Sequence, residues 1–315
     1  MCCLFGLIDY SHRLSGWQKG QIIRALAVES EARGTDAAGV AYNSGGKLQI
    51  HKRPGPARKL RLFIPDDVHV VMGHSRMTTQ GKAKFNRNNH PFAGKVPGTR
   101  FALAHNGVLY NDITLRRSRA LPDTRIETDS YVAVQLIEQQ GALTPSSLKT
   151  VAEAVEGSFV FTVLDEQDNF YFVKGDNPLC LLQFPFLGLY VYASTEAILR
   201  MALKGLWLNR EPSKKITVDG GEILWITPDG ARLSEHFAWE DSCFSGWYFN
   251  RRGSHLCTPG VSRTERQYLR ELKSVAAAFG YDGAEIDAML ADGWTTDEIE
   301  EMLYSGGWED LRCLY

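Results

Sequence analysis

The sequence has no long hydrophobic run, no strong excess of charge of either sign and no regular cysteine pattern. No stretch of about 18 consecutive apolar residues occurs, so we expect no membrane-spanning helix. The net charge is −2, which excludes a global field that attracts nucleic acid or an anionic membrane, and we expect neither as a partner. The first apolar run has no basic region before it and ends at Asp9, so no secretory signal is predicted.

Cysteine is scarce and scattered. The chain has six cysteines and no CxxC spacing, at positions Cys2, Cys3, Cys180, Cys243, Cys257 and Cys313. Six cysteines in 315 residues are too few for a disulfide framework, and the spacing does not suggest a zinc site. We therefore expect free thiols, a cytoplasmic location and no bound metal or cofactor.

What the sequence does contain is enough apolar residues, 44% of 315, for a sizeable core. Short β-branched and aromatic runs between Gly, Asp or Asn predict strands at 3–8, 39–42, 68–72, 101–105, 159–164, 170–174, 189–193 and 222–226. Apolar spacings of three and four predict helices at 17–32, 129–140, 146–155 and 195–204. Strands and helices mixed in this way indicate a layered α+β domain.

The pattern changes after residue 240. Residues 241–261 are irregular and rich in aromatics, so we interpret them as an ordered connector. From residue 262 the pattern is helical, and the segments 285–293 and 298–306 repeat Ile, Met and Leu at i, i+3 and i+4 before a glycine. Between residues 274 and 311 there are ten acidic residues and no Lys or Arg. This segment is either a solvated helical surface or a docking surface for a basic partner.

Cys2 stands directly behind the initiator methionine. Met1 is normally removed when a small residue follows, so we expect the mature chain to begin at Cys2. One residue would then carry a thiol nucleophile and a free α-amine, whose ordinary pKa of about 7.7–8.0 suits a base near neutral pH. The alternative is a small apolar residue that opens a strand.

Four further segments carry polar residues that packing does not explain. They are 33–39 (Arg-Gly-Thr-Asp-Ala-Ala-Gly), 73–81 (Gly-His-Ser-Arg-Met-Thr-Thr-Gln-Gly) with 89–92 (Asn-His-Pro-Phe), 104–108 (Ala-His-Asn-Gly-Val) and 127–130 (Glu-Thr-Asp-Ser). Taken in order with Cys2, they resemble the motifs of class II glutamine amidotransferases, in the N-terminal nucleophile (Ntn) hydrolase superfamily. The resemblance covers about residues 2–240.

The resemblance implies a fold and a domain order. Residues 2–240 would form a four-layer αββα sandwich with glutaminase activity. The connector 241–261 and an acidic, all-α region at 262–315 would follow. These last residues are too few for a synthase domain and hold no phosphate loop of the GxxxxGK[ST] type.

The resemblance also implies the groups that act on the amide. Cys2 would be the nucleophile, and the side-chain amide of Asn106 and the backbone N–H of Gly107 would donate to the oxyanion. Without the other motifs, an Asn-Gly pair would indicate a hairpin turn.

Further positions match the family's substrate contacts. Arg76 corresponds to the arginine that binds the α-carboxylate of glutamine, and Asp129 to the residue that binds the α-ammonium. A surface salt bridge and a charge at a helix N-terminus are the alternatives for these two residues. Thr79 and His90 correspond to residues that line the glutamine pocket, and Arg33 would support the nucleophile.

The chain departs from the family pattern at three positions: Cys3 replaces a glycine, Met77 a tryptophan and Thr78 an alanine. The predicted reaction is hydrolysis of glutamine to glutamate and ammonia through a γ-glutamyl thioester on Cys2. The ammonia would pass to a separate synthase partner, docked through the acidic helices. The alternatives are hydrolysis of another γ-glutamyl or amide substrate, and a non-catalytic sensor.

Overall fold

The computed structural model describes residues 2–60, 62–239 and 281–291, and a few further residues between 269 and 303. The chain divides into two compact units, Met1–Ala238 and Trp239–Tyr315, and each is described by itself. The predicted connector at 241–261 lies outside the described residues, as does most of the predicted helical region at 262–315.

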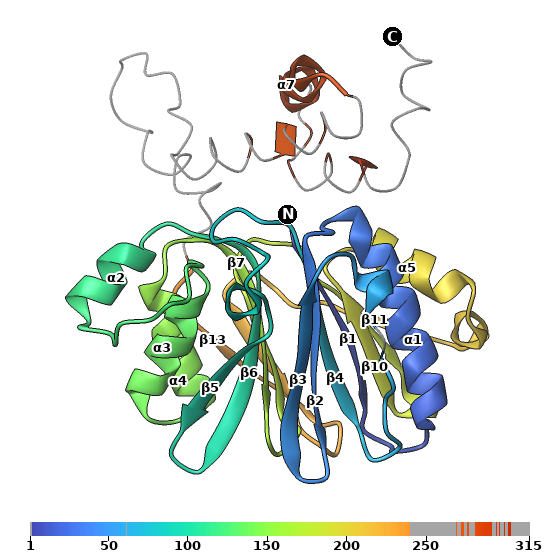
Figure 1. Ribbon diagram of the computed structural model, residues 1–315. Coiled ribbons are helices and arrows are strands. Elements are labelled where there is room, and N and C mark those ends of the chain that lie inside the picture. The colour runs from blue at the N-terminus through green and yellow to red at the C-terminus, as the bar shows by residue number, and fades with distance from the viewer. Residues whose placement is uncertain are drawn as a thin grey trace, which may run out of the picture. The chain divides into compact units, whose positions relative to one another are not determined.

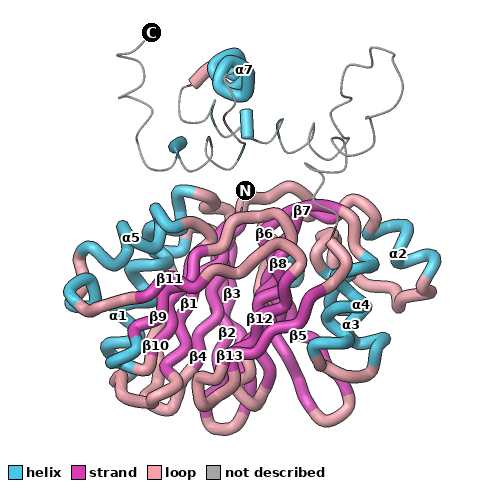
Figure 2. The backbone as a smooth tube through the Cα atoms, turned by 180° about the vertical axis from the view of Figure 1, so that it is seen from behind, coloured by secondary structure: helices cyan, strands magenta, loops and turns pink. Residues whose placement is uncertain are grey.

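The first unit contains two antiparallel sheets (Figures 1 and 2). In order across the seven-stranded sheet, the strands are β11 (Lys214–Ile216), β9 (Cys180–Phe184), β10 (Leu189–Ala193), β1 (Cys3–Asp9), β4 (Val70–Arg76), β2 (Ala37–Ser44) and β3 (Lys47–Pro54). In the six-stranded sheet they are β13 (Arg232–His236), β12 (Glu222–Ile226), β8 (Phe170–Lys174), β7 (Gly157–Asp165), β6 (Thr99–Leu109) and β5 (Phe92–Val96).

Helices cover the outer face of each sheet (Figure 1). On the seven-stranded sheet, α1 (Gly16–Glu29) packs against β1, and α5 (Glu196–Lys204) against β10. On the other side lie α2 (Asp112–Ser118), α3 (Tyr131–Gln140) and α4 (Pro145–Ala154), of which α3 contacts β5 and α4 contacts β12. Short 3-10 helices occur at Ser30–Ala32, Ala57–Lys59, Asn86–Asn88, Pro185–Leu187 and Trp207–Arg210. The predicted α+β sandwich of two sheets with helices is therefore present.

The two-residue repeat of β1 divides its side chains between two cores. Cys3, Phe5 and Leu7 pack with buried residues of α1 and α5. Leu4 and Ile8 belong to the core between the two sheets. Full burial of such side chains contributes about 1.5–3 kcal/mol each, so β1 is fixed from both faces as well as by its two neighbouring strands.

Strand β1 also requires a glycine at position 6, where its two neighbouring strands β4 and β10 approach it closely. A Cβ atom added there would lie 2.2 Å from the carbonyl oxygen of Val71 and 2.6 Å from the hydroxyl of Tyr192. Only glycine therefore fits at this position.

The helix that follows β1 begins with a capping box. Ser15 caps α1 by accepting from the N–H of Gln18, whose side chain accepts from the N–H of Ser15 in return.

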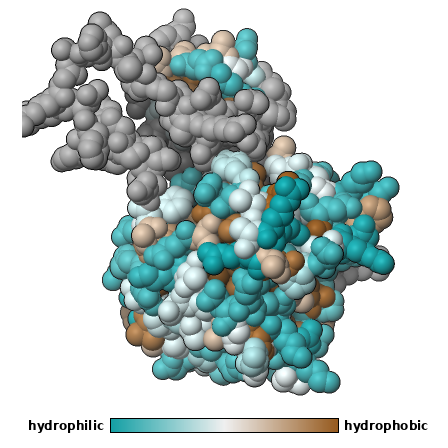
Figure 3. Space-filling view, turned by 90° about the vertical axis from the view of Figure 1, so that its left-hand side faces the viewer, coloured by the Kyte–Doolittle hydropathy of each residue, from teal (hydrophilic) through white to brown (hydrophobic). Residues whose placement is uncertain are grey.

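The surface on the side of α2 and α3 is mostly hydrophilic, and its apolar residues form small separate patches (Figure 3). Isolated exposed apolar residues of this kind are ordinary on a folded protein. Within the described part of the chain, no helix is long and apolar enough to cross a bilayer.

In the second unit the structure describes α7 (Gly283–Ala291). Ile286 of α7 and Ile299 occupy the same place in the sequence repeat, and both are fully buried. Lys273 forms a salt bridge with Asp287 of α7. The repeat therefore buries the same residue type in each copy, as its spacing predicts.

Candidate functional site

Cys2 lies immediately before β1 and is half-buried. Its Sγ is 3.5 Å from the carbonyl oxygen of Met77, and the Arg33 Nε donates to the Cys2 carbonyl oxygen at 2.9 Å. Burial raises the pKa of the Cys2 thiol, and the positive charge of Arg76 opposes that shift. The thiol therefore needs a base to become a thiolate near neutral pH.

The Cys3 side chain does not line the site around the Cys2 thiol. It is fully buried in the core beneath α1 and α5, and its Sγ donates to the carbonyl oxygen of Leu4 at 3.3 Å. Because side chains alternate along a strand, Cys2 shares the face of Leu4, which belongs to the core between the sheets. The cysteine that replaces the family's glycine thus points away from the nucleophile position.

Asn106 occupies the same gap from the opposite sheet. Ala102 and Ala104 of β6 pack between the sheets, and the two-residue repeat puts Asn106 on that face. Asn106 is fully buried, and within the described residues neither its Nδ2 nor its Oδ1 has a hydrogen-bond partner. An unmatched buried amide costs about 1–3 kcal/mol. Because Asn106 and Gly107 lie inside β6, the hairpin-turn alternative is wrong.

Gly107 is required by its backbone. Its φ is +138°, and a Cβ atom added there would lie 1.9 Å from the carbonyl oxygen of Ser158 on β7. Any other residue would clash with that strand and would hold a backbone conformation that side chains disfavour.

The register of β6 shows where the Gly107 N–H points. The Tyr110 N–H donates to the Glu156 carbonyl, so the even-numbered residues here face β7. On the other side of β6, the His105 carbonyl accepts from the His74 Nε2 at 2.9 Å, and the Leu109 N–H donates to Asp129 Oδ2 at 2.7 Å. Gly107 stands between these two residues, and the β5 ladder reaches only to Leu103. Its N–H is therefore directed away from β7, toward the side of Asp129.

Arg76 ends β4 and is buried, with 3% of its surface exposed. Its guanidinium donates to Asn89 Oδ1 (2.6 Å) and to the carbonyl oxygens of Gly81 (3.1 Å) and Gln80. Burial lowers the pKa of the guanidinium, and the charges of Cys2 and Asp129 oppose that shift. Arg76 is thus not a surface ion pair, and the structure brings it together with Cys2 and Asp129.

Asp129 lies just before α3 and is also buried. Its Oδ2 accepts from the backbone of Leu109, and its Oδ1 accepts from the Ser130 hydroxyl at 3.4 Å. The carboxylate therefore links the start of α3 to the end of β6, beside Gly107.

Three buried histidines lie behind this group. The His90 ring centroid is 4.2 Å from that of His74 and 6.5 Å from that of His105. Burial lowers the pKa of all three, that of His74 to about 3, so the rings are neutral at pH 7. Neither ring nitrogen of His90 has a hydrogen-bond partner in the described part of the chain. Thr79, in contrast, is exposed on the segment after β4.

Lys52 is a residue that the sequence did not single out. It lies in β3. Its Nζ donates to the carbonyl oxygens of Asn89 (2.6 Å) and Pro91 (2.9 Å), and burial lowers its pKa to about 8. Lys52 therefore holds the segment that carries His90. The alternation of Leu48 and Ile50 with polar residues could have indicated this strand, although not the contacts of Lys52.

Asn177 is a second residue that the sequence did not single out. It is buried in the connection between β8 and β9, and its Nδ2 donates to the Asn106 carbonyl oxygen at 3.1 Å. Asp176-Asn177-Pro178 reads locally as a turn, so no pattern in the sequence indicated this contact.

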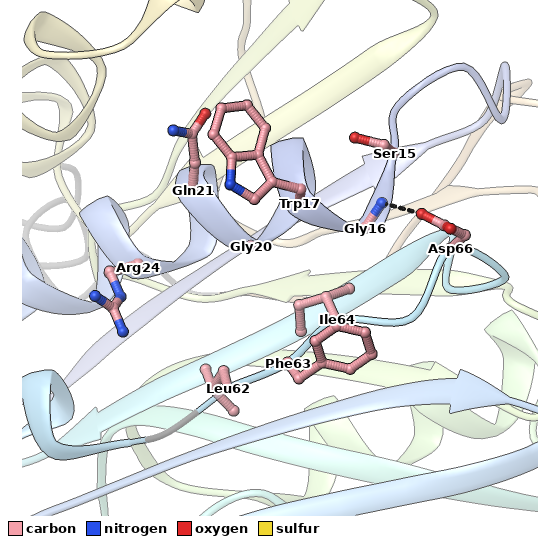
Figure 4. A pocket seen from close by; sticks show the side chains of 10 residues that line it. All are labelled: Ser15, Gly16, Trp17, Gly20, Gln21, Arg24, Leu62, Phe63, Ile64 and Asp66. Atoms are coloured by element: carbon pink, nitrogen blue, oxygen red, sulfur yellow. Dashed lines mark hydrogen bonds between the residues drawn. The ribbon is translucent and has the colours of Figure 1, made fainter.

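A separate groove of about 640 Å³ lies at the other end of β1, where the chain turns into α1 (Figure 4). Trp17 and Phe63 line it and are 70% and 83% exposed, and the Gly16 N–H donates to Asp66 Oδ1. None of the predicted site residues lines this groove. Among the described residues, no cluster of His, Cys, Asp or Glu could hold a metal ion.

Comparisons with known proteins identify relatives of part of this chain. Residues 74–200 match the family described as "Glutamine amidotransferase domain". The chain is 29% identical over 215 residues to a glutamine–fructose-6-phosphate aminotransferase (isomerizing) of Streptococcus pyogenes, covering 65% of this chain and 33% of that protein. It is 31% identical over 189 residues to the protein of the same name from Bacillus anthracis, covering 57% and 30%. The chain thus spans about a third of the length of these relatives.

A solved structure supports the fold. The glutamine phosphoribosylpyrophosphate amidotransferase of Bacillus subtilis superimposes with a TM-score of 0.61 at 22% identity, covering 75% of this chain and 49% of that one. The family match rests on residues 74–200, and the likeness to the solved structure concerns the fold. The chain therefore carries a class II glutamine amidotransferase domain.

Proposed function

We propose that this protein hydrolyses the side-chain amide of glutamine to glutamate and ammonia through a thioester on Cys2. The observation that carries the proposal is the buried Asn106, whose amide has no partner in the described residues and faces the same gap as Cys2. A fold gains nothing from such an amide, whereas an oxyanion would accept its hydrogen bond. The order of the motifs and the family match support the same reaction.

The reaction begins at the thiol. Removal of Met1 leaves the α-amine of Cys2 as the base that takes the thiol proton, directly or through one water. The thiolate attacks the amide carbon, and the oxygen takes the negative charge. The Asn106 Nδ2 and the Gly107 N–H donate to this oxygen, and removal of one such donor costs about 2.7–4 kcal/mol of barrier in other enzymes.

Collapse of the tetrahedral intermediate breaks the C–N bond, and the protonated amine returns its proton to the departing ammonia. Water then attacks the γ-glutamyl thioester, and glutamate leaves with Cys2 regenerated. Arg76 would bind the α-carboxylate and Asp129 the α-ammonium, because their charges have the required signs and lie beside Cys2. His90, Thr79 and Arg33 would line or support this pocket.

The test compares Cys2 with its neighbour Cys3, whose side chain is buried in the core beneath α1 and α5. The intact mass is measured first, to establish loss of Met1, and then after treatment with a diazo-ketone analogue of glutamine. We expect one adduct and glutaminase turnover in the wild type and in Cys3→Ala, and neither in Cys2→Ala. Turnover that survives in Cys2→Ala would exclude the proposed mechanism.

A second candidate function rests on Arg76. Its guanidinium already donates to three protein acceptors, so a substrate carboxylate must use the remaining donors or displace a carbonyl. Hydrolysis of an amide without an α-carboxylate would not need that exchange. Comparing kcat/KM for glutamine, γ-glutamyl amides and simple primary amides decides between the two, because glutamine and γ-glutamyl amides carry the α-carboxylate that pairs with Arg76 and simple primary amides do not.

We further propose that the ammonia is used by a separate protein that docks on the acidic segment 274–311. The ten acidic residues and the absence of Lys and Arg there suit a basic surface. Low basal glutaminase activity that rises with a cell extract, and no longer rises when Glu298, Glu300 and Glu301 are changed to Gln, is the expected result. High basal activity that no extract increases would contradict it.

A further inference from the structure

Asn177 contacts the peptide group that joins Asn106 to Gly107. Its side chain is 2% exposed, and its Nδ2 lies 3.1 Å from the Asn106 carbonyl oxygen. The same Nδ2 would be 2.6 Å from a Cβ atom placed on Gly107. The amide of Asn177 is therefore packed directly against the backbone that carries the Gly107 N–H.

The two ends of that peptide group point in opposite directions. In a trans peptide the carbonyl oxygen of one residue and the N–H of the next lie on opposite edges of one plane. Asn177 donates at the oxygen edge, and the Gly107 N–H emerges from the other edge, toward the side of Asp129. A hydrogen bond to the carbonyl polarises the peptide and strengthens its N–H as a donor, by about 10–30% per bond in condensed-phase estimates.

The segment that carries Asn177 is itself fixed to β7, the neighbour of β6. The Gly175 N–H donates to the Phe159 carbonyl at 2.9 Å, and the Phe159 N–H donates to Asp176 Oδ1 at 3.0 Å. Phe159 is paired with Gly107 in the ladder between β6 and β7. Asn177 is therefore held by the same strand that sets the position of Gly107.

We propose that Asn177 is a positioning residue that orients and polarises the Asn106–Gly107 peptide as an oxyanion donor. This inference rests on the proposed glutamine hydrolysis. Asn177 acts through the peptide and not on the substrate. Its contribution therefore grows only as negative charge develops, and its loss lowers kcat while KM stays unchanged.

The main variant is Asn177→Asp, which keeps the shape but replaces the N–H donor with an oxygen that repels the Asn106 carbonyl. We expect kcat to fall about tenfold or more, which is less than for loss of an oxyanion donor itself, with KM within a factor of about two. Asn177→Gln, which keeps the amide, should recover part of the loss. An aldehyde analogue of glutamine, which forms a tetrahedral adduct with the thiol, should bind Asn177→Asp more weakly by the same factor as kcat falls, whereas glutamate should bind unchanged.

Asn43 provides the matched control. It is also buried, and its Nδ2 also donates to a backbone carbonyl, that of Asp165, at 2.7 Å. Asn43→Asp should lose stability and keep kcat. Equal kcat in wild type and Asn177→Asp, or equal loss in the two asparagine variants, overturns the inference. Failure of the wild type to form the thiol adduct overturns the proposed function and the inference with it, and is visible before any variant is made.

Discussion

The two ends of β1 differ in how their fully buried side chains are paired. At the Asp9 end the two charged side chains are matched: Asp9 is fully buried and accepts from the backbone N–H groups of Leu14 (3.0 Å) and Arg13 (3.3 Å). The buried Lys19 nearby donates to the carbonyl oxygens of Asp66 and Val68. Each of these groups finds its partner within the fold.

At the Cys2 end several polar groups have no such partner. The Asn106 amide and both ring nitrogens of His90 are buried without one in the described ranges. Folded proteins satisfy most buried polar groups, so exceptions need a reason. The comparison teaches that Asp9 and Lys19 serve the fold, whereas Asn106 and His90 cost stability and suit a site that a ligand completes.

The sharpest test of this difference is Asn106→Leu, which removes the oxyanion donor and keeps the volume. We expect kcat for glutamine to fall about 10²–10³-fold. The free energy of unfolding should stay the same or rise, because an unmatched buried amide is replaced by an apolar group of similar shape. Urea denaturation and steady-state kinetics measure both. A marked loss of stability would show that the Asn106 amide serves the fold.

The complementary change is Asp9→Ala at the other end of β1. It leaves two backbone N–H groups without an acceptor, so the free energy of unfolding should fall by about 1–3 kcal/mol. Turnover per folded molecule should stay near the wild-type value, because Asp9 lies a whole strand away from Cys2. If kcat falls and stability does not, the assignment of the two ends is wrong.

A smaller effect is expected for Asp129→Asn, which keeps an oxygen to accept from the Leu109 N–H. The ammonium contact is similar in the ground state and the transition state, so its loss should raise KM about tenfold and change kcat little. Kinetics with glutamine and with a substrate that lacks the α-amine separate the two parameters. A lower kcat at unchanged KM would argue against the ammonium-binding role.

The smallest effect concerns pH. Burial lowers the folded-state pKa of His74 to about 3, so between about pH 6.5 and 3 the unfolded chain binds a proton that the folded chain does not. The contribution of His74 to the free energy of unfolding is therefore fully present above pH 6.5. It decreases as the pH drops, by up to about 1.4 kcal/mol per pH unit. His74→Gln should remove that part of the slope in urea titrations from pH 7 to 5. An unchanged slope would show that His74 is not a buried neutral ring.

The sequence predicted most of the central strands, but it missed the four edge strands and the interior strand β9. The runs at 159–164 and 170–174 match β7 and β8 because both strands are buried and apolar. The edge strands β3 and β13 were missed, since their sequences, KLQIHKRP and RLSEH, are mostly exposed and charged. An edge strand has one free side, so its residues need not be apolar.

Several strands extend further than predicted, and in β4 and β6 the extensions hold candidate site residues. The apolar pattern ends at residue 72, yet β4 continues to Arg76, and β6 continues past His105 through Asn106 and Gly107. Polar residues in a strand look like a loop when burial is unknown. The order of the motifs could still point to Cys2, Arg76, Asn106 and Asp129, which lie at or near the start of β1, the ends of β4 and β6, and the start of α3.

The contacts of Lys52 and Asn177 could not be predicted in that way. Each acts on a segment far away in the chain, Lys52 on the carbonyls of Asn89 and Pro91, and Asn177 on that of Asn106. A single polar residue has no periodicity, and its acceptors are backbone atoms that leave no mark in the sequence. Only the pairing of strands reveals them.

The central place of β1 has a consequence for the timing of biosynthesis. One neighbour of β1 is β4, and the other is β10, which ends at Ala193. At about 5–20 residues per second, roughly 10–40 seconds separate synthesis of Cys2 from synthesis of its last partner strand. During that interval β1 lacks one of its two neighbours. The removal of Met1 that the proposed reaction requires thus has a period during synthesis before the sheet closes around the strand.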